Sequence, residues 1–172
     1  ELLERGKHKA AFGECLVPGL SRRIADRELE ALGQTLGWTA EQLSVMPSRQ
    51  NEGPGNALMA TLAHEHVTEV FTSFGEKEVT SEKVARLLAK EVSAYMESQA
   101  PVGPHLADQL ALPMALAVQA SGKPGAYATS EMTEHTWTNL DVIRRFLPVK
   151  ISVREQSNTL QGWLVSFEPA SS

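Results

Sequence analysis

The sequence has a single cysteine, few aromatic residues and no long apolar run. Because Cys15 is the only cysteine among 172 residues, an intramolecular disulfide is excluded and a cysteine-rich zinc site is not indicated. The lack of a run of about 18 apolar residues predicts no membrane span. A cytoplasmic location fits both absences, and it is the expected one.

The charge balance is slightly acidic, with 16 basic and 21 acidic residues and a formal net charge of −5. This balance argues against a protein that coats nucleic acid through charge alone. It is compatible with a local basic pocket for one nucleic-acid end. Hydrophobic residues make up 42% of the chain, which is enough for a packed core and argues against bulk disorder.

The chain begins with Glu1 and has no initiator methionine. We therefore expect it to be a piece of a longer protein. Its length suits one domain or two small ones. The sequence Pro101-Val102-Gly103-Pro104 is the expected boundary, because proline and glycine interrupt regular structure. It separates a domain at 1–98 from a domain at 99–172.

The apolar pattern predicts an α+β chain, with a β-α-β-β-α region followed by an α-β-α-β-β region. Alternating apolar residues predict strands, and spacings of three and four predict helices. In the first region, Ser21 and Ser81 are the expected N-caps and Gly37 the expected C-cap. The predicted strands are 7–17, 57–63 and 67–74, and the predicted helices are 22–36 and 82–97. The inward positions of the second helix are Val84, Leu87, Leu88, Val92, Tyr95 and Met96.

The second region has an apolar helical segment at 105–119, in which Pro113 predicts a kink or a fresh start. A helix is expected at 138–147, ended by Pro148, with Val142, Ile143, Phe146 and Leu147 inward. Strands are expected at 126–131, from Val149 to Val153, and across Trp163, Val165 and Phe167. A turn near Ser157 and Asn158 joins the last two strands.

His135 is the first candidate for chemistry, because it stands just ahead of the predicted helix at 138–147. A neutral imidazole is a competent nucleophile towards phosphorus, and a helix N-terminus favours a bound phosphate. Thr136, Thr138 and Asn139 add hydroxyl and amide groups within one turn. The same pattern also fits a surface or capping histidine.

Asp108 and Gln109 form the second candidate pair. Asp108 can accept a hydrogen bond from a base, a ribose or a histidine, and Gln109 can both donate and accept. The alternative is that these are first-turn residues, in which the acidic side chain complements the helix dipole.

Other polar groups are weaker candidates. Gly53-Pro54-Gly55-Asn56 lacks the Lys-Ser/Thr ending of a P-loop, so a turn before a strand is the simpler interpretation. His64 and His66 would share one face of a strand but have no third metal ligand, so we expect them to face solvent. Two arginine pairs complete the set. Arg144 and Arg145 are expected on the polar face of their helix, and one of them could reach a phosphate. Arg22 and Arg23 stand at a helix start, where they could contact a partner.

Several short motifs follow one another along the chain. They are Phe74-Gly75-Glu76-Lys77, Val102-Gly103, Leu106-Ala107-Asp108-Gln109-Leu110, Pro113-Met114-Ala115-Leu116-Ala117, His135-x-x-Thr138-Asn139 and Arg145-Phe146-Leu147-Pro148. In these segments, and in the Gly53–Asn56 loop, the chain resembles the RNA 3′-terminal phosphate cyclase family over nearly its whole length. The resemblance implies that residues 1–98 are a small inserted domain. It implies that residues 99–172 are the carboxy-terminal repeat of a larger catalytic domain.

The resemblance also implies a function: ATP-dependent conversion of an RNA 3′-phosphate into a 2′,3′-cyclic phosphodiester through a covalent histidine–AMP. His135 matches the nucleophile, and Asp108 is placed to orient it. The nucleotide-site positions are His105, Leu106, Ala107, Asp108 and Gln109. ATP, a divalent cation (Mg²⁺ or Mn²⁺) and an RNA 3′ end are the implied cofactors and partners, with no protein metal ligands assigned.

Two departures from the family pattern bear on the site. Position 105 is His where the family has Tyr, and imidazole offers less area for stacking on adenine. Family members are also longer, and their amino-terminal half supplies arginines and other phosphate-site groups. This chain alone is therefore expected to be inactive. The alternatives are a non-catalytic ribosomal-RNA processing scaffold, which would lack the histidine, and an isolated insert-type binding module.

Overall fold

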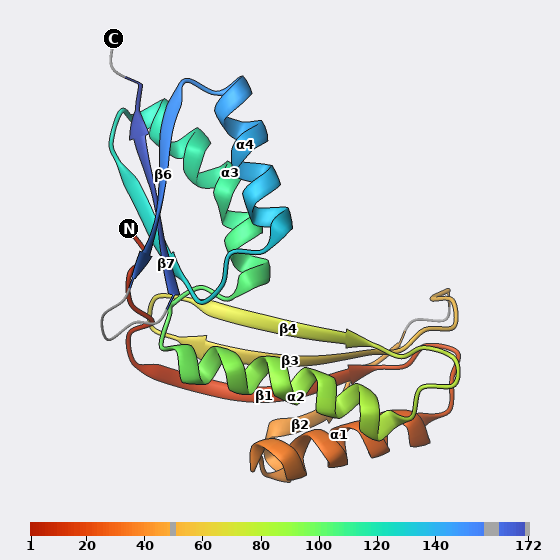
Figure 1. Cartoon of the computed structure of the whole chain (residues 1–172). Coiled ribbons are helices and arrows are strands. Elements are labelled where there is room, and N and C mark those ends of the chain that lie inside the picture. The colour runs from red at the N-terminus through yellow and green to blue at the C-terminus, as the bar shows by residue number, and fades with distance from the viewer. Residues whose placement is uncertain (49–50, 157–161, 171–172) are drawn as a thin grey trace. The chain divides into compact units, whose positions relative to one another are not determined.

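The computed structural model describes residues 1–48, 51–156 and 162–170, which form two compact units (Figure 1). The first unit comprises His8–His64 and Thr68–Met96, and the second comprises Glu1–Lys7, Glu65–Val67 and Glu97–Ser172. Each unit has its own sheet and its own hydrophobic core. Both contain helices and strands, so the predicted α+β class is confirmed.

The first unit is a four-stranded sheet in the order β2-β1-β3-β4, with two long helices. Strand β1 is parallel to β2 and antiparallel to β3, and β4 is antiparallel to β3. Its elements are β1 (His8–Leu16), α1 (Arg22–Leu36), the 3₁₀ turn η1 (Ala40–Gln42), β2 (Leu43–Val45), β3 (Ala57–His64), β4 (Thr68–Phe74) and α2 (Ser81–Ser98). The predicted strands and helices are confirmed. The sequence pattern misses β2, because three residues are too few to show an alternation.

Helix α2 buries a different set of residues from the one its spacing predicts. Leu87 and Met96 are each 50% exposed, whereas Ala85 and Ala89 are buried. The small alanine side chains form part of the face that packs on the sheet. The predicted core residues that are buried are Val84, Leu88, Val92 and Tyr95.

The helix caps follow the predicted positions only in part. Gly37 ends α1 in the left-handed conformation, with φ 70°, as predicted. Ser21 precedes α1, but its hydroxyl makes no capping hydrogen bond. Helix α2 already begins at Ser81, and the Thr80 hydroxyl accepts from the Lys83 amide at 3.3 Å. Thr80 therefore caps α2 in place of Ser81, which was the predicted N-cap.

The second unit is a three-stranded antiparallel sheet in the order β5-β7-β6. Two helices pack on it through one core (Figure 1). Its elements are α3 (Pro104–Ser121), β5 (Gly125–Thr129), α4 (Glu134–Phe146), β6 (Val149–Gln156) and β7 (Gly162–Pro169). The predicted α-β-α-β-β order is confirmed. The turn expected near Ser157 and Asn158 lies outside the described residues.

Helix α3 continues through Pro113 from Pro104 to Ser121, so a fresh start at Pro113 was a wrong prediction. Pro113 has no N–H to donate to the carbonyl one turn earlier. It is exposed, so water can reach that carbonyl. Although α3 is rich in apolar residues, none of the helices within the described ranges is long and apolar enough to cross a membrane.

Helix α4 begins at Glu134, four residues before the predicted start. The Thr133 hydroxyl accepts from the Thr136 amide at 3.1 Å and caps the earlier turn. His135 therefore lies within the first turn of the helix instead of ahead of it. The inward face also differs from the prediction, because Val142 and Phe146 are 46% and 80% exposed. The buried residues are Thr136, Leu140 and Ile143.

Candidate functional site

Helices α3 and α4 lie side by side and run in the same direction, so their N-terminal ends meet at one end of the second unit (Figure 1). The fifth residue of α3, Asp108, is joined to the sixth residue of α4, Asn139. Strand β5 ends at the same place, because Thr133 at the start of α4 follows Thr129 after three residues. The predicted site residues of both helices are thereby brought to one edge of the fold.

The side chain of Asn139 fastens the two helices to each other. Its Nδ2 donates to the Asp108 carboxylate at 2.9 Å and to the Asp108 backbone carbonyl at 3.0 Å. Asp108 lies one turn further into α3 than a first-turn position, and the first turn of α3 carries no acidic residue. The dipole interpretation of Asp108 is therefore wrong, and its carboxylate holds α4 instead.

His135 is the second residue of α4, and its side chain is exposed. Among the described residues it makes no hydrogen bond or ion pair, and the Asp108 carboxylate bonds Asn139 instead of His135. The imidazole is thus open to a ligand at the N-terminal end of α4. The backbone amides of a first turn, together with the helix dipole, favour an anion at that end.

The nucleotide-site candidates on α3 differ in burial. His105 and Gln109 are exposed, Leu106 and Asp108 are half-buried, and Ala107 is buried. Pro104 opens the helix, and its fixed φ suits a first helical position. Only the side chains of His105, Asp108 and Gln109 can offer polar groups, so the other two shape the wall and the core.

Tyr127 on β5 anchors the start of α3 to the sheet. Its hydroxyl donates to the Ala107 carbonyl at 2.9 Å, and its ring is fully buried in β5. Burial, and secondarily the charge of Asp108, raise the pKa of the Tyr127 phenol well above its usual range. The hydroxyl therefore stays protonated and remains a donor at neutral pH.

Trp137 and Trp163 form an aromatic pair that the sequence motifs did not single out. Trp137 lies on α4, two residues after His135, and is 38% exposed. Its ring meets that of Trp163 on β7 in a T-shaped contact, with centroids 5.9 Å apart. Gly162 lets β7 begin close to β5, since an added Cβ would lie 2.3 Å from the Thr129 carbonyl oxygen.

The sequence is similar to known proteins over most of its length. Residues 3–97 match the family model described as RNA 3′-terminal phosphate cyclase (RTC), insert domain. The chain is 40% identical over 158 residues to the RNA 3′-terminal phosphate cyclase of Koribacter versatilis (strain Ellin345). It is 42% identical over 156 residues to the protein of that name from Ralstonia nicotianae (strain ATCC BAA-1114 / GMI1000).

The chain belongs to the RNA 3′-terminal phosphate cyclase family. The aligned regions cover 92% and 90% of this chain but only 43% of each relative. The chain thus spans less than half the length of the curated cyclases that it matches. The first unit lies within the part matched by the insert-domain model.

The insert-type first unit of this cyclase relative buries a polar cluster inside its core. Glu28 on α1 is 1% exposed and accepts from Asn56 Nδ2 at 2.6 Å and from the Cys15 thiol at 3.4 Å. Burial raises the pKa of Glu28, although both hydrogen bonds act in the opposite direction. Burial, with the neighbouring Glu28, raises the pKa of the Cys15 thiol to about 12. Cys15 is therefore a protonated core residue and no nucleophile at neutral pH.

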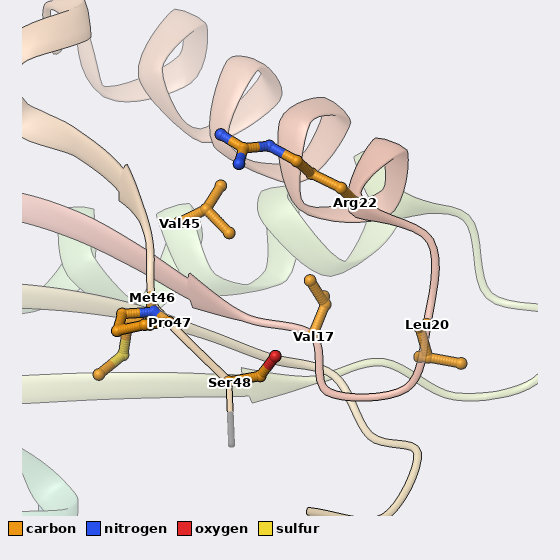
Figure 2. A pocket seen from close by; sticks show the side chains of 7 residues that line it. All are labelled: Val17, Leu20, Arg22, Val45, Met46, Pro47 and Ser48. Carbon is orange, nitrogen blue, oxygen red and sulfur yellow. The ribbon is translucent and has the colours of Figure 1, made fainter. Parts of the chain in front are cut away.

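A shallow hollow of about 420 Å³ lies at the end of β1 and β2 in the same unit (Figure 2). Apolar side chains dominate it, and Arg22 and Ser48 are its polar members. The Arg22 Nε is 3.6 Å from the Asp26 carboxylate, so part of its charge is already offset. None of the predicted site residues of the cyclase resemblance lines this hollow. Its lining residues are Val17, Leu20, Arg22, Val45, Met46, Pro47 and Ser48.

The weaker candidates are accounted for by local contacts. His66 is exposed as expected, but it lies in the turn after β3. His64 is half-buried, and the centroid of its ring lies 5.2 Å from the centroid of the His8 ring. The prediction that His64 faces solvent was therefore wrong. Arg144 bonds the Asp141 carboxylate at 2.6 Å and the Ile151 carbonyl at 3.1 Å. The Gly53–Asn56 loop precedes β3, as a turn would, and its Asn56 side chain donates a hydrogen bond to Glu28.

Proposed function

We propose that this chain provides the nucleophile and part of the nucleotide site of an ATP-dependent RNA 3′-phosphate cyclase. The observation that carries the proposal is the position of His135 in the first turn of α4, exposed beside the N-terminal end of α3. Membership of the cyclase family supports the reaction class. A cytoplasmic location is part of the same proposal.

In the proposed reaction, a ring nitrogen of His135 attacks the α-phosphorus of ATP. A P–N bond forms, the P–O bond to pyrophosphate breaks, and His135 carries AMP. An oxygen of the RNA 3′-phosphate then attacks the same phosphorus and displaces the imidazole. Finally the vicinal 2′-hydroxyl attacks the activated 3′-phosphate, losing its proton and releasing AMP. Each displacement has a good leaving group, which makes the overall condensation easier.

The two helix N-termini give a reason for placing the phosphates at this edge. Unpaired amides and aligned dipoles at the ends of α3 and α4 favour an anion there. Asp108 and Asn139 set the spacing of these ends through their two hydrogen bonds. We assign Asp108 to positioning, since its carboxylate holds α4 in place and reaches His135 only through the helix.

The remaining nucleotide-site candidates follow from their exposure. His105 offers an imidazole face for adenine, and Gln109 offers an amide that can both donate and accept. Both are exposed on α3, near Asp108. Leu106 contributes the apolar wall beneath them, and the buried Ala107 belongs to the core that supports it.

A divalent cation is expected to accompany ATP, but the part of the chain that the structure describes supplies no cluster of ligands for it. Among the described residues, no three His, Cys, Asp or Glu side chains gather closely enough to hold a metal ion. The donor set of the described residues therefore does not fit a protein-bound cation. No step of the proposed reaction is assigned to one.

The site is proposed to be completed by a further segment of polypeptide. The cyclases from Koribacter versatilis and Ralstonia nicotianae are more than twice as long as the regions aligned with this chain. We propose that an amino-terminal portion of this kind supplies the remaining phosphate-binding groups. On its own, residues 1–172 should not form the covalent adenylate.

The test is to fuse this chain to the amino-terminal portion of the Koribacter versatilis relative and to incubate the fusion with α-labelled ATP. The fusion should acquire acid-labile label, and His135→Asn should abolish it. His66→Asn is the matched control, because His66 is an exposed histidine in a turn outside the site. Undiminished labelling of the His135→Asn protein would sink the assignment of the nucleophile.

A second measurement separates the enzyme from the two binding alternatives. The labelled fusion should convert an RNA 3′-phosphate into a cyclic end, detected by its resistance to phosphatase. A fusion that folds but neither labels nor cyclises would favour a non-catalytic scaffold. Labelling of residues 1–172 alone would show that the site is complete without the amino-terminal portion.

A further inference from the structure

We propose that Trp137 is the stacking surface for the base of the 3′-terminal nucleotide of the RNA. The proposal rests on the proposed function, because it places the RNA phosphate beside His135. It adds a residue to which neither the family resemblance nor the reaction scheme assigns a role. Trp137 would be a positioning and affinity residue, with no part in bond making.

Trp137 lies on α4, two residues after His135. In a helix, residues two apart lie on opposite sides, and their Cα atoms are about 5.4 Å apart by helix geometry. Side chains also lean towards the helix N-terminus. His135 and Trp137 therefore stand on either side of the N-terminal end of α4. In the proposed complex, the 3′-phosphate lies at the histidine and the base of the same nucleotide lies at the tryptophan.

Trp137 is accessible to solvent and is also held by a contact with a second aromatic ring. Its side chain is 38% exposed, although most of a tryptophan surface is apolar. The Trp163 ring meets it at an interplanar angle of 85°. In a T-shaped pair at most one face of either ring is covered by the other. Trp163 therefore leaves at least one face of Trp137 uncovered, and the contact between the two rings restrains the rotation of Trp137.

In the proposed arrangement, this base and the adenine of ATP lie on different sides of α4. Asn139 contacts Asp108 of α3, so the side of α4 that carries Asn139 faces α3. His135 lies on nearly the same side, since residues four apart are neighbours on a helix. Adenine, placed on the α3 side near His105, leaves the Trp137 side of α4 free. The two nucleotides of the adenylyl-transfer step can then occupy opposite sides of one helix end.

The experiment measures binding of 5′-dye-labelled uridine pentanucleotides to residues 1–172 by fluorescence anisotropy. One oligonucleotide ends in a 3′-phosphorylated uridine, and the other ends in a 3′-phosphorylated abasic ribose. Base–aromatic stacking contributes about 1–3 kcal/mol, so Trp137→Leu should weaken binding of the first by about 5- to 150-fold. The wild-type chain should show the same penalty for the abasic end, and Trp137→Leu should show almost none.

Two controls make the result specific. Trp38→Phe changes a tryptophan that packs against the core of the first unit, and it should leave both affinities unchanged. Far-ultraviolet circular dichroism and thermal unfolding check that Trp137→Leu is folded. An equal abasic penalty in wild type and Trp137→Leu overturns the proposal, and so does an absence of binding by the wild-type chain. If Trp137→Leu weakens ATP binding instead, the stacked base is adenine and the proposal is wrong.

The outcomes also distinguish this proposal from the proposed function. A preference of the wild-type chain for a 3′-phosphate over a 3′-hydroxyl end tests recognition of the reacting group. If that preference is found but Trp137→Leu binds like wild type, the stacking proposal fails while the cyclase function stands. If the base-dependent penalty is found without the phosphate preference, the cyclase function is weakened and the stacking surface stands.

Discussion

The two units bury and expose their polar groups in opposite ways. In the first unit, a carboxylate, a thiol and an amide meet inside the core, where Glu28 is 1% exposed. In the second unit, His105, Gln109 and His135 are exposed where two helices begin. A buried, satisfied cluster rigidifies a core, whereas exposed groups on a rigid support can meet a ligand. The comparison therefore directs the search for a site to the second unit.

Each unit has a hydrophobic core of its own that supports its sheet. The two clusters have no residue in common. Damage to one core should therefore be felt mainly in its own unit.

The largest effect is expected from a substitution that creates a cavity beneath the candidate site. Leu140 is 0% exposed in the core of the second unit, so Leu140→Ala should lower the free energy of unfolding by about 2–5 kcal/mol. Hydrogen exchange should accelerate in α3, α4 and β5–β7 and stay unchanged in β1–β4. Phe146→Ala, at an 80% exposed position on the same helix, is the control. Equal acceleration in both units would show that they unfold together.

A smaller loss is expected when the link between α3 and α4 is removed. Asn139→Ala deletes both hydrogen bonds to Asp108, one of them to a carboxylate, and should cost about 1–2 kcal/mol. Thermal unfolding measures this change, with the exposed Thr138→Ala as the control. An unchanged midpoint for Asn139→Ala would mean that Asp108 does not set the spacing of the helices.

The anchor beneath α3 should contribute about as much as one neutral hydrogen bond. Tyr127→Phe removes the donor to the Ala107 carbonyl but keeps the buried ring. A loss of about 1 kcal/mol is expected from denaturant unfolding. If the variant is as stable as wild type, packing of the ring alone holds α3 to the sheet.

The smallest expected effect concerns the pH dependence of the first unit. The folded-state pKa of Glu28 lies above its ordinary value of 4.5. Its contribution is therefore fully present below pH 4.5 and is lost as the pH rises through the folded-state pKa. Glu28→Gln should remove this loss and make the unit more stable at neutral pH than wild type. The measurement is unfolding as a function of pH, and Glu30→Gln, an exposed change on α1, controls for the lost charge.

An opposite result for Glu28 would be equally informative. If Glu28→Gln destabilises the unit at every pH, the carboxylate is ionised in the core and its bond to Asn56 outweighs the cost of burial.

Local sequence patterns predicted most of the elements but not all of their ends. Alternation at Leu58, Ala60 and Leu62 gave β3 correctly, because each of these residues faces the core. The start of α4 was predicted four residues late, since the cap is the Thr133 hydroxyl and the spacing of apolar residues does not report it. Leu87 and Phe146 were placed inward for a similar reason: the period of a helix does not say where its buried face stops.

The candidate site was predicted as residues but not as a geometry. The resemblance to the cyclase family singled out His135, Asp108 and Gln109, and it suggested that Asp108 orients the histidine. The structure instead joins Asp108 to Asn139, across 31 positions of the chain. The pairing of Trp137 with Trp163 carries no local signal, because it depends on where β7 meets α4.

By itself, the sequence determined the α+β class, most helices and strands, and membership of the cyclase family, because apolar periodicity and motif order are local properties of the chain. Only the tertiary structure decided that Glu28 is a buried carboxylate and that His135 stands exposed in a first turn. It also decided which side chains meet at the ends of α3 and α4. These features depend on contacts between distant segments, which packing fixes and which a linear pattern does not record.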